Sequence, residues 1–418
     1  MQLLPTILVP FVLSTLCLFS PSSLLWLLKI FRSICYSEPP HNYSRLLRDI
    51  KNVLDPPRAP GMIAILLQER ADSNKRLIRA LNISNTFVSS EVAVHEQFVR
   101  QARHLLNNVK GRGWQSFQST TFDAVRWQLE QDPSIEIPFD RFIQNITLVV
   151  VLLEILQVEN PVEALSYDDI TLIANHITTL WSLSKKSDPI PPDLLPALQA
   201  ALRRIVINKN LFPDPLNFVV PAWETLWRVV ATTVAYSFAR TDYKESFQHF
   251  SAYPSERRFA RASMMPGETV SVQAIVSEAM RLHPPSKHIG RVRCRSWCPE
   301  FFRKWLARPG WIFRKKSADI QKILRCHEIW GSDSDTFDPS RCQEFAGREE
   351  EQSAALGLVF GHGPLKCIAS SWAPVAAAVI SGAILEQFNE SMGHTLQVGA
   401  EIGGRTGWIG WSVIRKED

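Results

Sequence analysis

The chain has 418 residues, enough for one large domain or two ordinary ones, and a net charge of +5, too mildly basic to indicate a nucleic-acid partner by itself. Hydrophobic residues make up 45% of the chain, which excludes a disordered protein, and a mean hydropathy of −0.05 excludes a polytopic membrane protein. Only 18 residues are glycine, which favours helices over turn-rich β structure. The seven cysteines are an odd number in a long chain, so we do not expect a disulfide scaffold.

Residues 1–30 are predicted to form a membrane anchor. From Leu3 to Ile30 the only charged residue is Lys29, and about 20 apolar residues span a bilayer. A cleaved signal peptide is the alternative, but no basic residue precedes the apolar run and no small-x-small cleavage site follows it. Because Lys29 and Arg32 lie at the C-terminal side of the run, the positive-inside rule places the rest of the chain in the cytosol.

Residues 31–60 are expected to form an extended, proline-rich linker, since they contain two proline pairs and a further proline, Pro60. Residues 61–418 would then form the main domain. Apolar residues recur there at helical spacing, for example from Val94 to Leu106, whereas alternating strand patterns are few. The apolar run from Phe142 to Leu156 is too short to span a membrane and is expected to pack in the core. The sequence therefore predicts a mainly α domain with minor β structure.

Further along the chain, an apolar helix is predicted from about Leu216 to Phe238, with a bend at Pro221. The next helical pattern, which ends at Pro284 and Pro285, carries Glu278 and Arg281. These two residues are three positions apart and share a helix face, where they can pair with each other or with a third group.

Eleven Lys and Arg residues lie between residues 291 and 325, interleaved with tryptophans. A solvated or membrane-facing surface is the favoured interpretation of this basic segment, and nucleic-acid binding is the least favoured one. A zinc site formed by Cys294, Cys298, Cys326 and His327 is disfavoured, because their spacing fits no standard zinc finger. Arg341 follows the basic segment. Its planar guanidinium group could join the pair of Glu278 and Arg281 by binding the carboxylate of Glu278.

The stretch from Phe360 to Ala369 is the most informative part of the sequence. Gly361 and Gly363 permit a tight loop whose backbone can approach a flat ligand closely. Cys367 is expected to open a helix, where the helix dipole would favour its thiolate, and a thiolate can ligate a soft metal or haem iron. Taken alone, the loop is better explained as a structural cysteine in a glycine-rich turn.

Taken together, the motifs resemble the cytochrome P-450 superfamily of haem-thiolate monooxygenases. Three motifs in the family's order carry the resemblance: Glu278 and Arg281, then Phe337, Pro339 and Arg341, then Phe360, Gly363 and Cys367. The resemblance is specific from about residue 216 to residue 390. It implies a mainly α fold with small β-sheets, preceded by a membrane helix, and a haem b whose iron is ligated by Cys367. The other cofactor-binding residues that it implies are Phe360, Gly363, Glu278, Arg281 and Arg341.

The resemblance also assigns roles to the predicted bent helix. Its Pro221–Thr225 stretch is similar to the family's oxygen-activating stretch, so Glu224 and Thr225 are expected to be catalytic, as an acid–alcohol pair that passes protons. The chain departs from the family at Leu365, where relatives have the Arg or His that binds a haem propionate. His362 or Lys366 would have to substitute for it.

The function implied by the resemblance is insertion of one oxygen atom from O2 into a lipophilic small molecule. Electrons would come from NADPH through a separate reductase flavoprotein, for which the basic segment is a candidate docking surface. The membrane lipid would be a further partner, nucleic acid would not, and the location would be the endoplasmic reticulum membrane, with a single pass and a cytosolic catalytic domain. The single anchor and Ala369 resemble fungal secondary-metabolite oxygenases. The alternatives are a haem-thiolate isomerase or dehydratase that does not use O2, and a degenerate non-catalytic membrane protein.

Overall fold

The computed structural model describes residues 43–57, 63–261, 270–294, 313–343, 349–388 and 393–416. It divides into two units, Met1–Leu46 and Leu47–Asp418, and the arrangement below concerns the second unit. The predicted anchor, residues 1–30, lies outside the described residues. Among the residues that are described, no helix is both long and apolar enough to cross a membrane.

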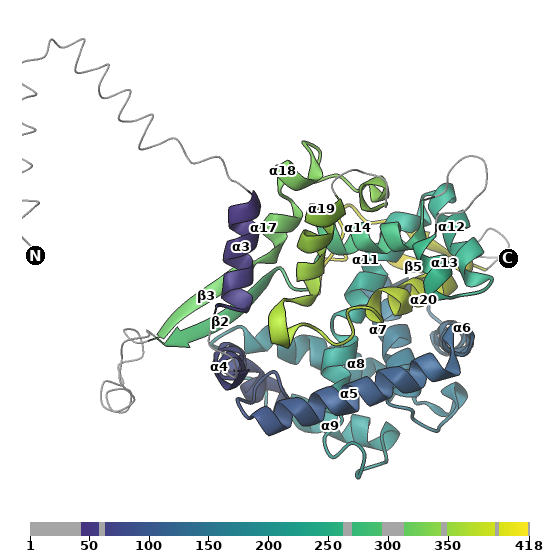
Figure 1. The fold of residues 1–418 in the computed structure, drawn as a ribbon. Helices are drawn as coiled ribbons and strands as arrows, with labels where there is room; N and C mark the ends of the chain where they lie inside the picture. Colours follow the sequence, from purple (N-terminus) through teal and green to yellow (C-terminus); the bar gives the residue numbers. More distant parts are fainter. Residues whose placement is uncertain are drawn as a thin grey trace, which may run out of the picture. The chain divides into compact units, whose positions relative to one another are not determined.

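Helices dominate the second unit, and its five described strands are short (Figure 1). The α-helices are α3 (Tyr43–Leu54), α4 (Ile63–Leu81), α5 (Val92–Arg112), α6 (Trp114–Gln131), α7 (Phe139–Val150), α8 (Tyr167–Ser184), α9 (Leu194–Ile205), α10 (Leu216–Trp223), α11 (Leu226–Phe238), α12 (Thr241–Ser251), α13 (Glu256–Ala260), α14 (Val272–Leu282), α17 (Ile320–Leu324), α18 (His327–Trp330), α19 (Glu349–Gly357) and α20 (Ala373–Glu386). The strands are β1 (Glu136–Pro138), β2 (His288–Cys294), β3 (Phe313–Asp319), β4 (His394–Gln397) and β5 (Ser412–Arg415). The predicted mainly α fold class is confirmed.

Part of the segment expected to be an extended linker is helical. Helix α3 lies between the two proline pairs, contains no proline, and has Leu46, Ile50 and Leu54 at four-residue spacing. Ile50 and Leu54 are buried, so one face of this helix is apolar and packed. Proline composition alone predicted an extended chain, and the apolar spacing between the prolines overrides it.

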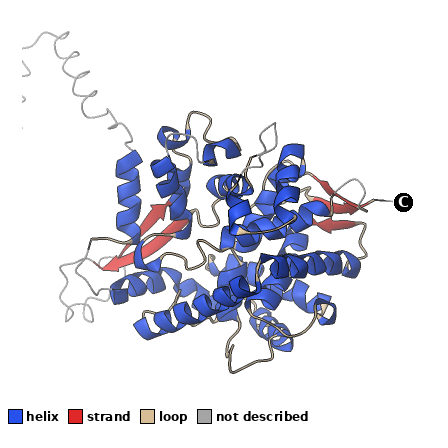
Figure 2. Ribbon diagram, turned by 45° about the vertical axis from the view of Figure 1, so that its right-hand side comes forward, coloured by secondary structure: helices blue, strands red, loops and turns tan. Residues whose placement is uncertain are grey.

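The core is built from helices that are buried on nearly all sides. Helix α11 packs against α20, α7 and α14, and every residue of α20 from Val375 to Leu385 is buried. Helix α7 continues into a π-helix, Val151–Ile155, so the apolar run that begins at Phe142 packs in the core as expected. The two sheets lie on opposite sides of this helical core (Figure 2). One is the antiparallel hairpin β2–β3, and the other has the order β1–β5–β4.

The predicted bend at Pro221 is present as a break between two helices. Pro221 lies inside α10, and Glu224 and Thr225 form a turn before α11 begins. Since proline has no N–H, the carbonyl of Asn217 four residues earlier loses its helical partner. The side-chain amide of Asn85 donates to that carbonyl at 2.8 Å. A residue from a distant segment therefore satisfies the backbone group that the proline leaves free.

This contact gives a test of the break. Asn85→Ala should lower the free energy of unfolding by about 1–3 kcal/mol, because it leaves the Asn217 carbonyl without a donor. In a Pro221→Ala background the loss should be smaller by at least about 0.5 kcal/mol, because the restored N–H can donate to the same carbonyl. Urea denaturation of the wild type, both single variants and the double variant measures this coupling. Equal losses in both backgrounds would show that Asn85 does not compensate for the proline.

Candidate functional site

Glu278 and Arg281 form a fully buried ion pair in α14. Both side chains are 0% exposed, and Nε and Nη2 of the arginine donate to the two carboxylate oxygens at 2.7 Å each. Two parallel charge-assisted hydrogen bonds combine strength with fixed orientation. The pairing expected from their three-residue spacing is confirmed.

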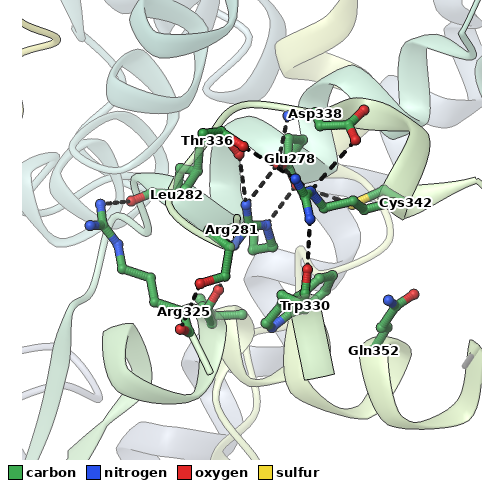
Figure 3. Close-up of polar contacts among 12 residues, drawn as sticks. Glu278, Arg281, Leu282, Arg325, Trp330, Thr336, Asp338, Cys342 and Gln352 are labelled. Atoms are coloured by element: carbon green, nitrogen blue, oxygen red, sulfur yellow. Dashed lines mark hydrogen bonds and ion pairs between the residues drawn. The ribbon is translucent and has the colours of Figure 1, made fainter. Parts of the chain in front are cut away.

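The remaining hydrogen-bonding groups of this pair hold the chain downstream of α17 (Figure 3). The Nη atoms of Arg281 donate to three backbone carbonyls: Leu324 at 2.8 Å, Ser334 at 2.6 Å and Thr336 at 3.2 Å. Glu278 accepts from the backbone N–H of Asp338 at 2.9 Å. The guanidinium of Arg281 also lies 5.0 Å from the ring centre of Trp330. One buried ion pair therefore fixes the course of a segment that has little regular structure of its own.

Arg341 lies at the outer side of this pair. Its Nε is 4.0 Å from Glu278 Oε1, at the limit of an ion pair. Its shorter contacts are to Asp333, whose carboxylate accepts from Nη1 at 2.8 Å and also from Nη2, and to the carbonyl of Trp330 at 2.6 Å. The hydrogen bond from Arg341 lowers the pKa of Asp333 to about 2. Sequence reasoning missed Asp333, because only the folded turn brings it to Arg341.

Phe337 ties the same segment to the core helix α11. Its ring stacks on Tyr236 with centroids 3.8 Å apart, and the Tyr236 hydroxyl hydrogen-bonds His283 Nε2 at 2.9 Å. Burial, together with the nearby Arg325 and Lys287, lowers the pKa of His283 to about 4. This histidine is therefore neutral at neutral pH and adds no charge to the network.

Cys367 lies in a loop between α19 and α20 that is closed by its own backbone. The N–H of Cys367 donates to the carbonyl of Phe360 at 2.8 Å. Gly361 and Gly363 have φ values of +80° and +71°, a region that residues with a side chain rarely adopt. A Cβ atom on Gly363 would also collide with the side chain of Asp55, which follows α3. Conformation favours glycine at both positions, and packing against Asp55 also requires it at Gly363.

The prediction that Cys367 opens a helix is wrong. Residues 368–372 form turns, and α20 begins at Ala373 with a proline in its first turn, a position that proline favours. Without a helix N-terminus at the sulfur, partial desolvation by the surrounding loop raises the pKa of the Cys367 thiol, although the N–H of Ala369 and the charge of Lys366 act in the opposite direction. A cation bound to the sulfur would favour the thiolate.

Cys367 is the exposed one of the cysteines whose side chains are described. Cys342 is partly buried, and its sulfur lies 3.6 Å from Glu278 Oε2. Burial and the charge of Glu278 raise the pKa of Cys342 strongly, so it remains a thiol. Within the described parts of the chain, no three His, Cys, Asp or Glu side chains are grouped to bind a metal ion. Cys298 of the disfavoured zinc site lies outside those parts.

Glu224 and Thr225 occupy the break between α10 and α11. Glu224 is 3% exposed, and its two oxygens accept from Arg228, at 2.8 Å, and from Arg405. Thr225 is half-buried beside it. The contact with Arg228 follows from the four-residue spacing on a helix, whereas no local signal in the sequence points to Arg405. In this arrangement both carboxylate oxygens of Glu224 are bound by arginines, whereas the resemblance implied that Glu224 passes protons together with Thr225.

Two residues were expected to replace the Arg or His that is missing at Leu365. Burial, followed by the nearby Lys51, lowers the pKa of His362, so its ring is mostly neutral at neutral pH. Lys366 is exposed and directly precedes Cys367. Of the two, Lys366 is the better cation for an anionic group at this loop.

Comparison with known proteins extends the motif resemblance. No family model matches the chain. A stretch of 131 residues, 30% of this chain, is 25% identical to cytochrome P-450 714A2 of Arabidopsis thaliana and spans 23% of that protein. The crystal structure of the cytochrome P-450DA haem domain aligns with 85% of this chain and 84% of its own, with a TM-score of 0.53 at 12% identity. A mutant of that domain aligns with 93% of this chain and 94% of its own, with a TM-score of 0.56 at 14% identity. The structure of CYP175A1 from Thermus thermophilus aligns with 84% of this chain and 83% of its own, with a TM-score of 0.53 at 15% identity.

The chain has the cytochrome P-450 fold. A haem fits the Cys367 loop of this fold on the chemistry of its donors. Cys367 is exposed, the N–H of Ala369 donates to its sulfur, and Gly361 leaves the backbone open to a flat group. Cys367 would ligate the iron, and the half-buried Phe360 begins the loop that holds it.

Glu278 and Arg281 are fully buried among protein groups, so their part in the P-450 fold is to position the chain that precedes this loop. Arg341 acts with them, through Asp333 and Trp330.

Removing either partner of the buried pair should unfold much of the protein. Glu278→Ala or Arg281→Ala leaves an uncompensated buried charge and should lower the free energy of unfolding by about 3–5 kcal/mol. As the control, Arg240→Ala breaks an ion pair with Asp242 whose side chains are 58% and 40% exposed, and should cost less than about 1 kcal/mol. Denaturant titration and haem content of the purified variants give the comparison. If Arg281→Ala behaved like Arg240→Ala, the buried pair would not organise this region.

Proposed function

We propose that this chain is a haem-thiolate monooxygenase that inserts one oxygen atom from O2 into a lipophilic small molecule. The observation that carries the proposal is the exposed Cys367 thiol, held in a glycine-bounded loop within a P-450 fold. A haem b bound there would supply the redox chemistry of oxygen reduction. Its electrons would come from NADPH through a separate reductase flavoprotein.

Within this proposal Thr225 delivers protons to the reaction. Its hydroxyl lies at the break between α10 and α11, where the helix opens and the side chain is only half-buried. A positioned hydroxyl can donate and accept protons in turn. For Glu224 we propose the part of a fixed anion that orients water beside Thr225, since both of its oxygens already accept from arginines.

The membrane location and the biological pathway are further parts of the proposal. Support for a single-pass anchor in the endoplasmic reticulum, with the catalytic domain in the cytosol, is the apolar run before Lys29 and Arg32. Lys315 and Lys316 are exposed on β3 within the basic segment, which supports contact with anionic membrane lipid or with an acidic reductase. The motif details favour natural-product biosynthesis of the fungal kind, and no feature favours nucleic acid as a partner.

A haem-thiolate isomerase or dehydratase that does not use O2 is the second candidate. The observation in its favour is that Glu224 is bound by Arg228 and Arg405, which removes part of the proton relay that separates the two reactions. The candidates differ in their need for reductant, because only the monooxygenase consumes NADPH as it forms product.

Replacing the proposed iron ligand should remove the thiolate-bound haem. Cys367→Ala should lose the carbon-monoxide difference band of a thiolate haem and all oxidation, because no other soft ligand lies in the loop. Cys326→Ser is the matched control, since this residue precedes α18 at an N-cap position, where serine is favoured. A Cys367→Ala protein that kept the thiolate band would refute the assignment of the ligand.

The role of Thr225 predicts uncoupling. In an assay reconstituted with a reductase, Thr225→Ala should keep consuming NADPH while product falls several-fold, with hydrogen peroxide accounting for the difference. Thr225→Ser keeps the hydroxyl and should keep most of the coupling. NADPH, product and peroxide are measured in the same reaction. Unchanged product per NADPH in Thr225→Ala would remove Thr225 from the mechanism, and product formed without NADPH would favour the isomerase.

A further inference from the structure

Basic side chains from four segments gather around Glu224 and Trp181. Arg76 comes from α4, Lys185 directly follows α8, Arg228 is in α11, and Arg405 lies between β4 and β5. We call these four cations, with Glu224 and Trp181, the Trp181 cluster.

The cluster is organised around one ring and one carboxylate. The guanidinium of Arg76 lies 4.9 Å from the ring centre of Trp181, and that of Arg405 lies 4.7 Å from the same ring. Arg405 and Arg228 donate to the two oxygens of Glu224, and Arg228 also donates to the carbonyl of Pro285 at 2.7 Å. Arg76 and Arg405 therefore both lie over the ring of Trp181. Arg228 and Arg405 both bind the carboxylate of Glu224.

The charges of the cluster do not balance. It contains four cations, and Glu224 is the only acid among the described residues that forms an ion pair with any of them. Desolvation lowers the pKa of Lys185 and Arg405, and neighbouring cations of the cluster lower it further, whereas the charge of Glu224 raises it. Like charges brought together in a poorly solvated site raise each other's free energy unless an anion joins them.

The C-terminal end of α8 does not supply that anion. Its partial negative charge is already matched by Arg79, which donates to the carbonyls of Leu183 and Ser184 at 3.3 and 3.2 Å. Arg76 reaches only the hydroxyl of Ser184. The Nε of Arg405 is buried without an acceptor. Donors thus remain for a further negatively charged group.

We propose that the Trp181 cluster binds the carboxylate of a small organic acid. Guanidinium groups offer paired donors that match a carboxylate, as Glu224 already shows. The side chains of Arg228 and Arg405 are only 12% exposed, so they offer little surface to a macromolecule, and a small anion is the better match. The inference rests on the proposed function for one step, that the bound acid is the substrate; Thr225, next to Glu224, then lies beside the bound molecule.

Calorimetric titration of the full chain with decanoate and with methyl decanoate tests the charge requirement directly. The two probes share their carbon chain and differ in the carboxylate. Decanoate should bind the wild type at least tenfold more tightly than the ester. Arg405→Gln, and independently Arg76→Gln, should weaken decanoate binding at least tenfold and leave ester binding within about twofold. Arg204→Gln removes the same charge from an arginine that is 58% exposed and pairs with Asp169, away from the cluster, and should change neither affinity.

Equal affinities for acid and ester in the wild type, or unchanged decanoate binding in both cluster variants, would overturn the inference. In that case the four cations would serve only to hold Glu224 and the end of α8. The carbon-monoxide difference spectrum of the same preparation separates this failure from failure of the proposed function. A thiolate haem without acid preference would overturn the Trp181 cluster alone, and acid preference without a thiolate haem would overturn the monooxygenase alone.

Discussion

Burial of Glu278 with Arg281 takes two charges out of water. The hydrogen bonds that compensate for this burial determine the conformation of the segment that follows α17. The cost is several kcal/mol per ion, so every donor and acceptor of the pair must find a partner. The partners are mostly backbone groups of residues 324–338, which are then held in one conformation. That conformation in turn presents Phe337 to Tyr236 and Arg341 to Asp333. The segment from Leu324 to Asp338 is thus held by a polar network rather than by a sheet.

The buried acids Glu278 and Glu224 have different kinds of hydrogen-bond partners. This difference distinguishes a structural role for Glu278 from the proposed ligand-binding role of the cluster around Glu224. Glu278 is matched by one arginine and by a backbone N–H, all within a segment that it organises. Glu224 lies where a proline has broken a helix, and it is bound by two arginines, of which Arg405 has a buried Nε without an acceptor. The first arrangement has no capacity left for a ligand. The second has an excess of positive charge, and it adjoins Thr225.

Features that depend on local spacing could be predicted from the sequence. The pair in α14, the buried run that begins at Phe142 and the bend at Pro221 all follow from residues within a few positions of one another. Features that depend on distant segments could not: Arg405 meets Glu224 across 181 residues, and Asp55 packs against Gly363 from the far end of the domain. The prediction of a helix directly after Cys367 was wrong for a local reason. Pro374 favours the first turn of a helix, and α20 therefore begins at Ala373. The membrane anchor and its topology stay predictions.

Strand β5 is the middle strand of its sheet, and this has a consequence for the order of folding. Ile414 pairs with Glu136 on one side and with Thr395 on the other, and the N–H of Phe139, the first residue of α7, donates to the carbonyl of Trp411. During synthesis, residues 136–139 therefore leave the ribosome long before their partners exist. The start of a central helix therefore waits for a segment made much later, a contact of high sequence separation and high loop-closure entropy. Until then, this end of the apolar helix α7 depends on its helical neighbours alone to cover it.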